Sequence, residues 1–126
     1  MELRVYSADE VHAALPWPAL ADTLEAAFVG GRTEVPVRHA HALPSDGTLL
    51  LMPAWSDSAL GVKVVTVMPG AAARGAGTVQ ASVLLLDRDS GQPRALIDGE
   101  ALTLRRTAAT SALAARHLAR SDASAL

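Results

Sequence analysis

The chain has 126 residues, half of them apolar, a formal net charge of −2 and no cysteine. This length suits one domain with a single hydrophobic core. The charge, without any block of Lys or Arg, argues against a nucleic-acid partner. The lack of cysteine excludes a disulfide framework and a thiolate zinc site. No apolar stretch is long enough to span a bilayer, and the N-terminus does not resemble a signal peptide. We therefore expect a cytoplasmic protein without a membrane partner.

The first part of the chain predicts two helices. Ser7 and Glu10 form the S-x-x-E pattern of a capping box, which predicts a short helix ending near Leu15. An amphipathic helix is predicted from Ala19 to Val29, and the following glycine pair is typical of a helix end. Its predicted apolar stripe consists of Leu20, Leu24 and Phe28.

From position 35 onward the pattern is that of strands and turns. We expect strands at 37–43, 48–54, 60–67, 79–87 and 93–97, with tight turns at 44–47 and 89–91 and a glycine-rich loop at 69–78. Asp98 is the predicted N-cap of a long alanine-rich helix that runs to about Arg120. Helices, then an antiparallel meander, then a long helix indicate an α+β fold.

Lys63 is the only lysine of the chain and lies within the apolar run Leu60–Val67. A run so rich in valine predicts a strand buried on both faces, or nearly so. Burial of an ammonium group there costs on the order of several kcal/mol unless an anion or strong acceptors meet it. The pKa of lysine also shifts readily on burial, which suits the residue to proton transfer. Lys63 is therefore the first candidate for a functional residue.

Two arginines are candidate companions of Lys63. Arg38 lies early in the predicted strand 37–43, where either an inward or a surface position fits the pattern. Arg106 shares a helical stripe with Leu102, Ala109 and Leu113, which predicts an apolar face for Arg106 and a solvated position for its neighbour Arg105. Cations that converge in a sheltered pocket require an anion, and a guanidinium group binds a carboxylate through two hydrogen bonds. The alternative is that both arginines are ordinary surface residues or pair with nearby acids.

Two other sequence patterns resemble known binding motifs but do not predict a site. Gly75-Ala76-Gly77 begins like a dinucleotide-binding fingerprint, but it precedes a strand instead of opening a helix, so we do not expect a Rossmann turn. His39 and His41 share one face of a predicted strand, yet no third ligand is placed by the sequence, and we predict no metal site.

Several segments, in order and spacing over nearly the whole chain, resemble the ornithine cyclodeaminase/mu-crystallin family. These segments are Val35–Arg38, Leu51–Pro53, Leu60–Lys63, Leu86–Asp87 with Gly91–Pro93, and Leu102–Thr103 with Arg106–Ala109. The two histidines, with Met68-Pro69-Gly70 before Arg74-Gly75, most resemble members described as Δ1-pyrroline-2-carboxylate/Δ1-piperideine-2-carboxylate reductases.

The resemblance implies a homodimer of two-domain subunits. Residues 1–120 match the substrate-binding and dimerisation domain, and residues 121–126 match the start of the connection to a Rossmann domain. That second domain, absent from this sequence, provides a catalytic aspartate and most of the NAD(P)H site. In the family, the positions of Arg38, Lys63 and Arg106 bind the carboxylate and the amine or imine end of a small substrate. Lys63 is also a candidate proton relay, and the position of Thr78 approaches the nicotinamide.

The resemblance therefore implies the substrate-binding half of an NAD(P)-dependent oxidoreductase that acts on cyclic imino acids or amino acids. Two alternatives stay open. An ornithine cyclodeaminase begins its reaction with the reverse hydride step, so the residues of this half do not separate the two enzymes. A protein like mu-crystallin would bind small carboxylates without turnover. For the 126 residues alone we expect no turnover.

Overall fold

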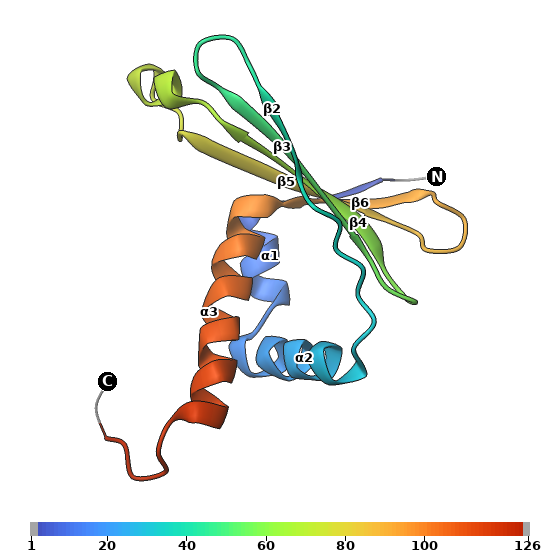
Figure 1. Cartoon of the computed structure of the whole chain (residues 1–126), viewed down its shortest axis with the longest axis vertical. Coiled ribbons are helices and arrows are strands. Elements are labelled where there is room, and N and C mark those ends of the chain that lie inside the picture. The colour runs from blue at the N-terminus through green and yellow to red at the C-terminus, as the bar shows by residue number, and fades with distance from the viewer. Residues whose placement is uncertain (1–2, 125–126) are drawn as a thin grey trace.

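The computed structural model describes residues 3–124, in which a six-stranded mixed sheet and three α-helices form an α+β fold (Figure 1). The predicted fold class is thereby confirmed. In chain order the elements are β1 (Arg4–Tyr6), α1 (Ala8–Ala14), α2 (Trp17–Gly30), β2 (His39–Ala42), β3 (Thr48–Trp55), β4 (Leu60–Val67), the 3₁₀-helix η1 (Pro69–Arg74), β5 (Val79–Leu86), β6 (Pro93–Asp98) and α3 (Gly99–Leu118). Among these residues no helix is both long and apolar enough to cross a membrane.

The sheet has the strand order β1-β6-β5-β4-β3-β2. Strands β2 to β6 form the predicted antiparallel meander, in which Met52, Lys63 and Val83 lie opposite one another on β3, β4 and β5. Strand β1 pairs in parallel with β6 at the sheet edge and was not predicted. Three residues are too few to display an alternating pattern, and their pairing partner is about ninety residues away in the chain.

Local sequence signals fix the helix ends. The Ser7 amide donates to the Glu10 carboxylate at 2.9 Å and the Glu10 amide donates to the Ser7 hydroxyl, which confirms the capping box. Gly31 ends α2 in the left-handed conformation with φ of 70°, which glycine adopts without steric cost. At the start of α3 the Asp98 carboxylate accepts from the Ala101 amide at 2.8 Å, as the sequence predicted.

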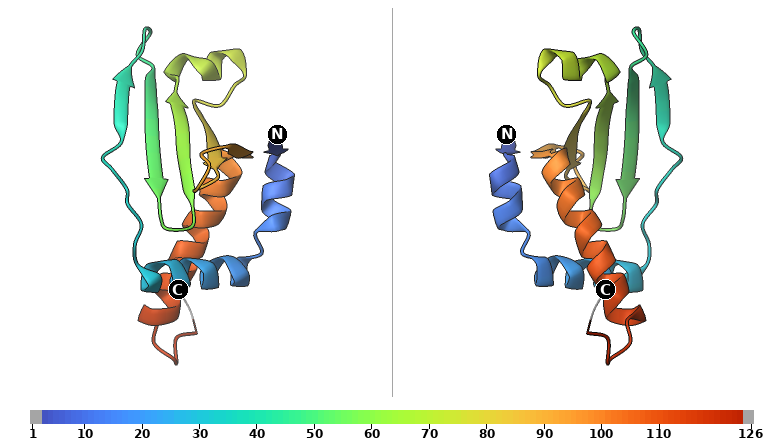
Figure 2. Two further views of the ribbon diagram at one scale, coloured as in Figure 1. Left: turned by 90° about the vertical axis from the view of Figure 1, so that its right-hand side faces the viewer. Right: turned by 90° about the vertical axis from the view of Figure 1, so that its left-hand side faces the viewer.

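The helices lie on one side of the sheet, and α3 descends steeply from it (Figure 1). Its first residue, Gly99, lies so close to β5 that a Cβ atom at this position would be 2.6 Å from the backbone carbon of Ala81. Only glycine permits this approach. Figure 2 shows α3 between α1 on one flank and the half of the sheet formed by β2, β3 and β4 on the other.

Two packing predictions were wrong. Strand β4 is half-buried along its length apart from Val65, which is 7% exposed, because the helices cover only one side of the sheet and contact chiefly β5 and β6. Phe28 was predicted on the apolar stripe of α2, yet it is 67% exposed. The buried residue of α2 is instead Ala21, whose small side chain gives a weak periodic signal.

Candidate functional site

The lysine singled out by the sequence joins the sheet to α3. Lys63 Nζ donates a hydrogen bond of 2.6 Å to Thr103 Oγ1. The Thr103 hydroxyl in turn donates to the Gly99 carbonyl oxygen at 2.6 Å, so its oxygen is left to accept the lysine proton. Sequence reasoning did not select Thr103 as a site residue. The available signal was its place three residues before Arg106, which makes the two neighbours on the helix surface.

Both predicted arginines act on Lys63. Burial lowers the pKa of Lys63 from its ordinary value, and the positive charges of Arg106 and Arg38 lower it further. The sheet register accounts for the position of Arg38. Ala40 pairs with Leu50 on β3, and the same register continued by two residues sets position 38 beside Met52, the partner of Lys63. The structure thus brings into one region residues from three distant segments.

None of these three cations forms an ion pair in the part of the chain that the structure describes. The ion pairs found within residues 3–124 involve other arginines and His117, and none involves Arg38, Lys63 or Arg106. An anion that enters this region would relieve the mutual repulsion of the cations. The arrangement therefore favours a carboxylate or another small anion as ligand.

The predicted burial of the two neighbouring arginines on α3 was wrong. Arg105 is half-buried, whereas Arg106 is exposed. Arg105 Nε donates to His12 Nδ1 at 2.9 Å and Nη1 donates to the Leu15 carbonyl oxygen at 3.3 Å. Its Cζ atom also lies 4.1 Å from the centre of the Trp17 ring.

The buried row of α3 explains this exchange, because Ala101, Arg105, Ala109 and Leu113 follow one another at steps of four. Two of its members are alanines, and in a helix rich in alanine such a row cannot be told from its neighbours by pattern. Arg38 is exposed as well, so only Lys63 of the three cations lies in a sheltered place.

A cavity of about 250 Å³ lies beside the Lys63–Thr103 hydrogen bond. Its other lining residues are Val65, Val79, Ala81, Glu100 and Leu104. Thr78, predicted to approach the cofactor, immediately precedes Val79 and is half-buried, and its carbonyl oxygen accepts from the Met68 amide at 2.8 Å. The site thus combines a polar end with walls that are largely apolar.

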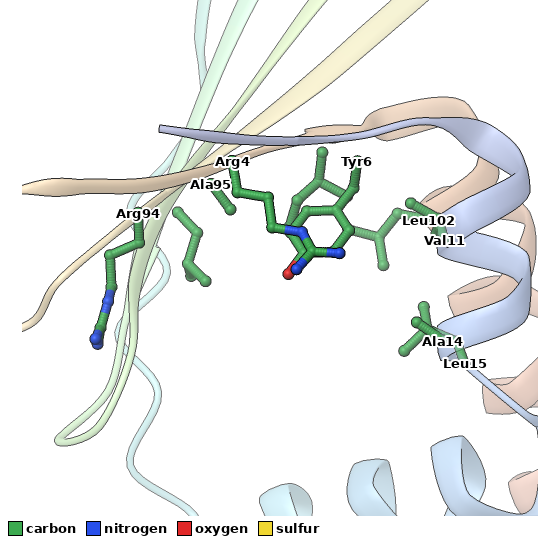
Figure 3. Close-up of a pocket in the computed structure, with 10 residues that line it drawn as sticks. Arg4, Tyr6, Val11, Ala14, Leu15, Arg94, Ala95 and Leu102 are labelled. Carbon is green, nitrogen blue, oxygen red and sulfur yellow. The ribbon is translucent and has the colours of Figure 1, made fainter. Parts of the chain in front are cut away.

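A larger cavity of about 550 Å³ lies on the other flank of α3, beneath β1 and beside α1 (Figure 3). Its wall is mostly apolar, and its charged lining residues are already engaged. Arg4 lies with its Cζ atom 4.5 Å from the centre of the Tyr6 ring, and Arg94 Nη1 is 2.9 Å from Asp87 Oδ2. None of the residues predicted to bind substrate or cofactor lines this cavity, so we place the candidate site at Lys63.

The two histidines of β2 lie near each other, with 6.3 Å between their ring centres. Within residues 3–124 no group of three or more His, Cys, Asp or Glu side chains is arranged to hold a metal ion.

Known proteins resemble this chain over most of its length. The Delta(1)-pyrroline-2-carboxylate reductase of Bacillus cereus is 40% identical over 102 residues, which are 79% of this chain and 31% of that protein. The structure of Thermococcus litoralis Delta(1)-pyrroline-2-carboxylate reductase in complex with NADH and L-proline has a TM-score of 0.81 at 34% identity, and covers 95% of this chain and 39% of that one.

An archaeal alanine dehydrogenase dimer with bound NAD has a TM-score of 0.85 at 29% identity, over 98% of this chain and 39% of that one. The chain thus spans between about a third and two fifths of the length of these relatives. A model of the ornithine cyclodeaminase/mu-crystallin family matches residues 1–126. The chain therefore belongs to the ornithine cyclodeaminase/mu-crystallin family.

Proposed function

We propose that this chain is the substrate-binding part of an NAD(P)-dependent enzyme that reduces cyclic imino acids of the Δ1-pyrroline-2-carboxylate type. The main observation is that Lys63 lies beside a small cavity where burial, and then the positive charges of Arg106 and Arg38, lower its pKa. The similarity to two Delta(1)-pyrroline-2-carboxylate reductases supports this choice of substrate class.

Each polar residue has a role in this proposal. Arg38 and Arg106 bind the substrate carboxylate, and their exposed side chains are free to turn towards it. Lys63, held by Thr103, orients the ligand and donates a proton to the imine nitrogen. A lowered pKa makes the Lys63 ammonium a stronger acid, which favours this transfer. Fixing the imine carbon in a reactive position lowers the barrier by reducing the entropy lost on reaction.

The surroundings of Thr78 fit a nicotinamide ring. Val79, the next residue along the chain, lines the cavity together with Leu104; the two are 51% and 58% exposed and provide apolar surface for a flat ring. When bound, NAD(P)H supplies the hydride that adds to the imine carbon. In this proposal Thr78 contacts the nicotinamide, and the rest of the cofactor is bound by residues outside these 126.

We further propose that the protein is a cytoplasmic homodimer. The side of the sheet opposite the helices is uncovered in the single chain (Figure 1). By alternation this side presents Leu49, Leu51, Val62 and Val64, all half-buried. Continuous apolar surface of this kind is typical of an interface, and the similar alanine dehydrogenase is a dimer. Light scattering of the full-length protein should give the mass of two subunits, and a monomer would refute this assembly.

The activity is tested with the full-length protein and NADPH or NADH. Addition of Δ1-pyrroline-2-carboxylate should consume the reduced nicotinamide, followed by its absorbance, and yield proline. Ammonia release from ornithine with NAD⁺, without imine reduction, would identify a cyclodeaminase instead. Tight binding of a carboxylate ligand without any turnover would identify a binding protein. All three outcomes are compatible with the proposed binding residues, but only the first supports the proposed reaction.

A further inference from the structure

We propose that Glu100 selects substrates whose ring nitrogen carries a positive charge, by placing a carboxylate on the side of Thr103 opposite to Arg106 along α3. This inference rests on the proposed function and adds a specificity residue that the sequence did not indicate. Glu100 lines the same cavity as Lys63 and Thr103.

The order of side chains along α3 gives the site a direction. Glu100, Thr103 and Arg106 follow one another at steps of three, so each is a neighbour of the next on the helix surface. The helix rises about 1.5 Å per residue, which puts Glu100 and Arg106 about 4.5 Å along the axis on either side of Thr103. The Lys63–Thr103 hydrogen bond therefore lies between a negative and a positive side chain.

A cyclic imino acid has a matching arrangement of groups. Its carboxylate pairs with the arginine end, and its ring methylenes lie against Val65 and Ala81, which leaves Val79 and Leu104 for the nicotinamide. The ring nitrogen is bonded to the carbon that carries the carboxylate, so with the carboxylate at the arginine end the nitrogen lies at the level of Thr103, about one helical turn from Glu100. The cavity of about 250 Å³ is slightly smaller than typical drug-sized sites, which suits a ligand with a single small ring.

Glu100 also resolves an electrostatic conflict in the proposed reaction. Hydride addition is favoured by a protonated imine, but Lys63, Arg38 and Arg106 all oppose a further positive charge. Glu100 is the carboxylate among the residues that line the cavity, and it offsets this repulsion at the nitrogen. It does so whether the nitrogen arrives protonated or receives its proton from Lys63.

A purely structural role is the alternative for Glu100, because an acidic residue in the first turn of a helix interacts favourably with the helix dipole. The two roles differ in what they affect. A helix-dipole role changes the stability of the protein and treats all ligands alike. A role in selecting the ligand changes the relative affinity for ligands with and without a charge on nitrogen.

The experiment compares two carboxylates of similar shape by calorimetry on the full-length protein in the presence of NAD⁺. L-proline has a protonated nitrogen, whereas the ring nitrogen of pyrrole-2-carboxylate is uncharged. Glu100→Gln should weaken L-proline binding about tenfold, as expected for loss of a charged partner, and change pyrrole-2-carboxylate binding by less than about twofold. Because the readout is a ratio of affinities in the same protein, partial loss of folded material cancels.

Asp9→Asn is the matched control, since it removes an acidic group from the first turn of α1 and leaves the cavity untouched. This control should leave both affinities unchanged. Equal weakening of both ligands in Glu100→Gln, or no weakening of either, would overturn the selective role of Glu100 and leave the proposed function intact. Failure of both ligands to bind the unaltered protein would overturn the proposed function and this inference with it.

Discussion

Lys63 Nζ and Thr103 Oγ1 lie 2.6 Å apart although their residues are separated by forty positions in the chain. The hydrogen bond connects the middle of β4 with the first turns of α3. Because the Thr103 proton is used by Gly99, the threonine holds the lysine in place as a pure acceptor. A protonated lysine has three donor hydrogens, so two remain for a ligand.

Replacement of Thr103 tests the importance of this connection. Thr103→Val keeps the shape of the side chain but removes the acceptor, and we expect kcat/KM for the imine substrate to fall by about tenfold, the equivalent of about one hydrogen bond. Thr103→Ser retains the hydroxyl and should remain close to the unaltered enzyme. Steady-state kinetics of the full-length protein measure both. Similar kinetics for the two variants would show that the hydroxyl has no part in positioning Lys63.

Lys63→Met tests the lysine itself. The substitution removes a half-buried charge that Arg38 and Arg106 disfavour, so the melting temperature should be unchanged or higher. The affinity for a carboxylate substrate should fall, because part of the positive charge at the site is lost. Thermal unfolding and ligand titration measure the two effects separately. A variant with unaltered ligand affinity would restrict Lys63 to a structural role.

The pH dependence follows from the same group. In the folded protein the pKa of Lys63 is lowered, so the side chain loses its proton at a lower pH than an unfolded lysine does. Carboxylate affinity should therefore be constant below this lowered pKa and decline above it. The contribution of Lys63 to the free energy of unfolding should rise with pH between the lowered value and the ordinary value of 10.5, because the unfolded state then binds more protons. Both dependences should be absent in Lys63→Met.

Arg105 and Arg106 are adjacent in the chain but should respond oppositely to substitution. Arg105→Met removes two hydrogen bonds and the contact with Trp17, and should destabilise the protein by about 2 kcal/mol. Arg106→Met removes an exposed charge near Lys63, and should raise KM for a carboxylate substrate while stability changes by less than about 0.5 kcal/mol. Urea unfolding and steady-state kinetics distinguish the two variants. The reverse result would favour the expectation from the sequence, in which Arg106 lies on the buried face of α3 and Arg105 is solvated.

Gly99→Ala tests the close packing of α3 on the sheet. The added methyl group would overlap the backbone of Ala81, so we expect a loss of about 1–3 kcal/mol together with a longer or broken Lys63–Thr103 hydrogen bond. Gly70→Ala is the control, since the nearest atom to a Cβ at Gly70 is Arg74 Nη1 at 4.0 Å. Urea midpoints compare the two. Equal midpoints would show that α3 moves away from the sheet without cost.

Much of the fold could be predicted because its elements have strong local signals. The valine-rich run of β4 and the capping groups Ser7 and Asp98 were sufficient to locate the elements around them. Strand β1 could not be predicted, because its formation depends on an edge of β6 that exists only after folding. The burial of α3 was misjudged because alanine occurs on several of its faces, and the larger residues alone indicated the wrong row.

The site was predictable to a similar extent. Lys63 was recognisable as a lone cation within an apolar strand, a signal contained in a few consecutive residues. Thr103 and Glu100 were not recognisable, because their significance depends on where α3 crosses β4 and β5. That crossing is set by the contact between Gly99 and Ala81, and neither residue shows from its type alone that the two backbones meet.

Because α3 is held against the sheet at Gly99, any change in its tilt is a rotation about this residue. The helix has twenty residues and is therefore about 30 Å long, so a tilt of about 5° about Gly99 would displace its far end by about 2.5 Å. The same tilt would move Thr103 by only about 0.5 Å, because this residue is one turn from Gly99. Arg116 near the far end contacts Asp22 of α2 at 2.8 Å, so α2 would travel with it. Members of the family are thus expected to differ in the direction of α2 while the lysine and the threonine keep their spacing.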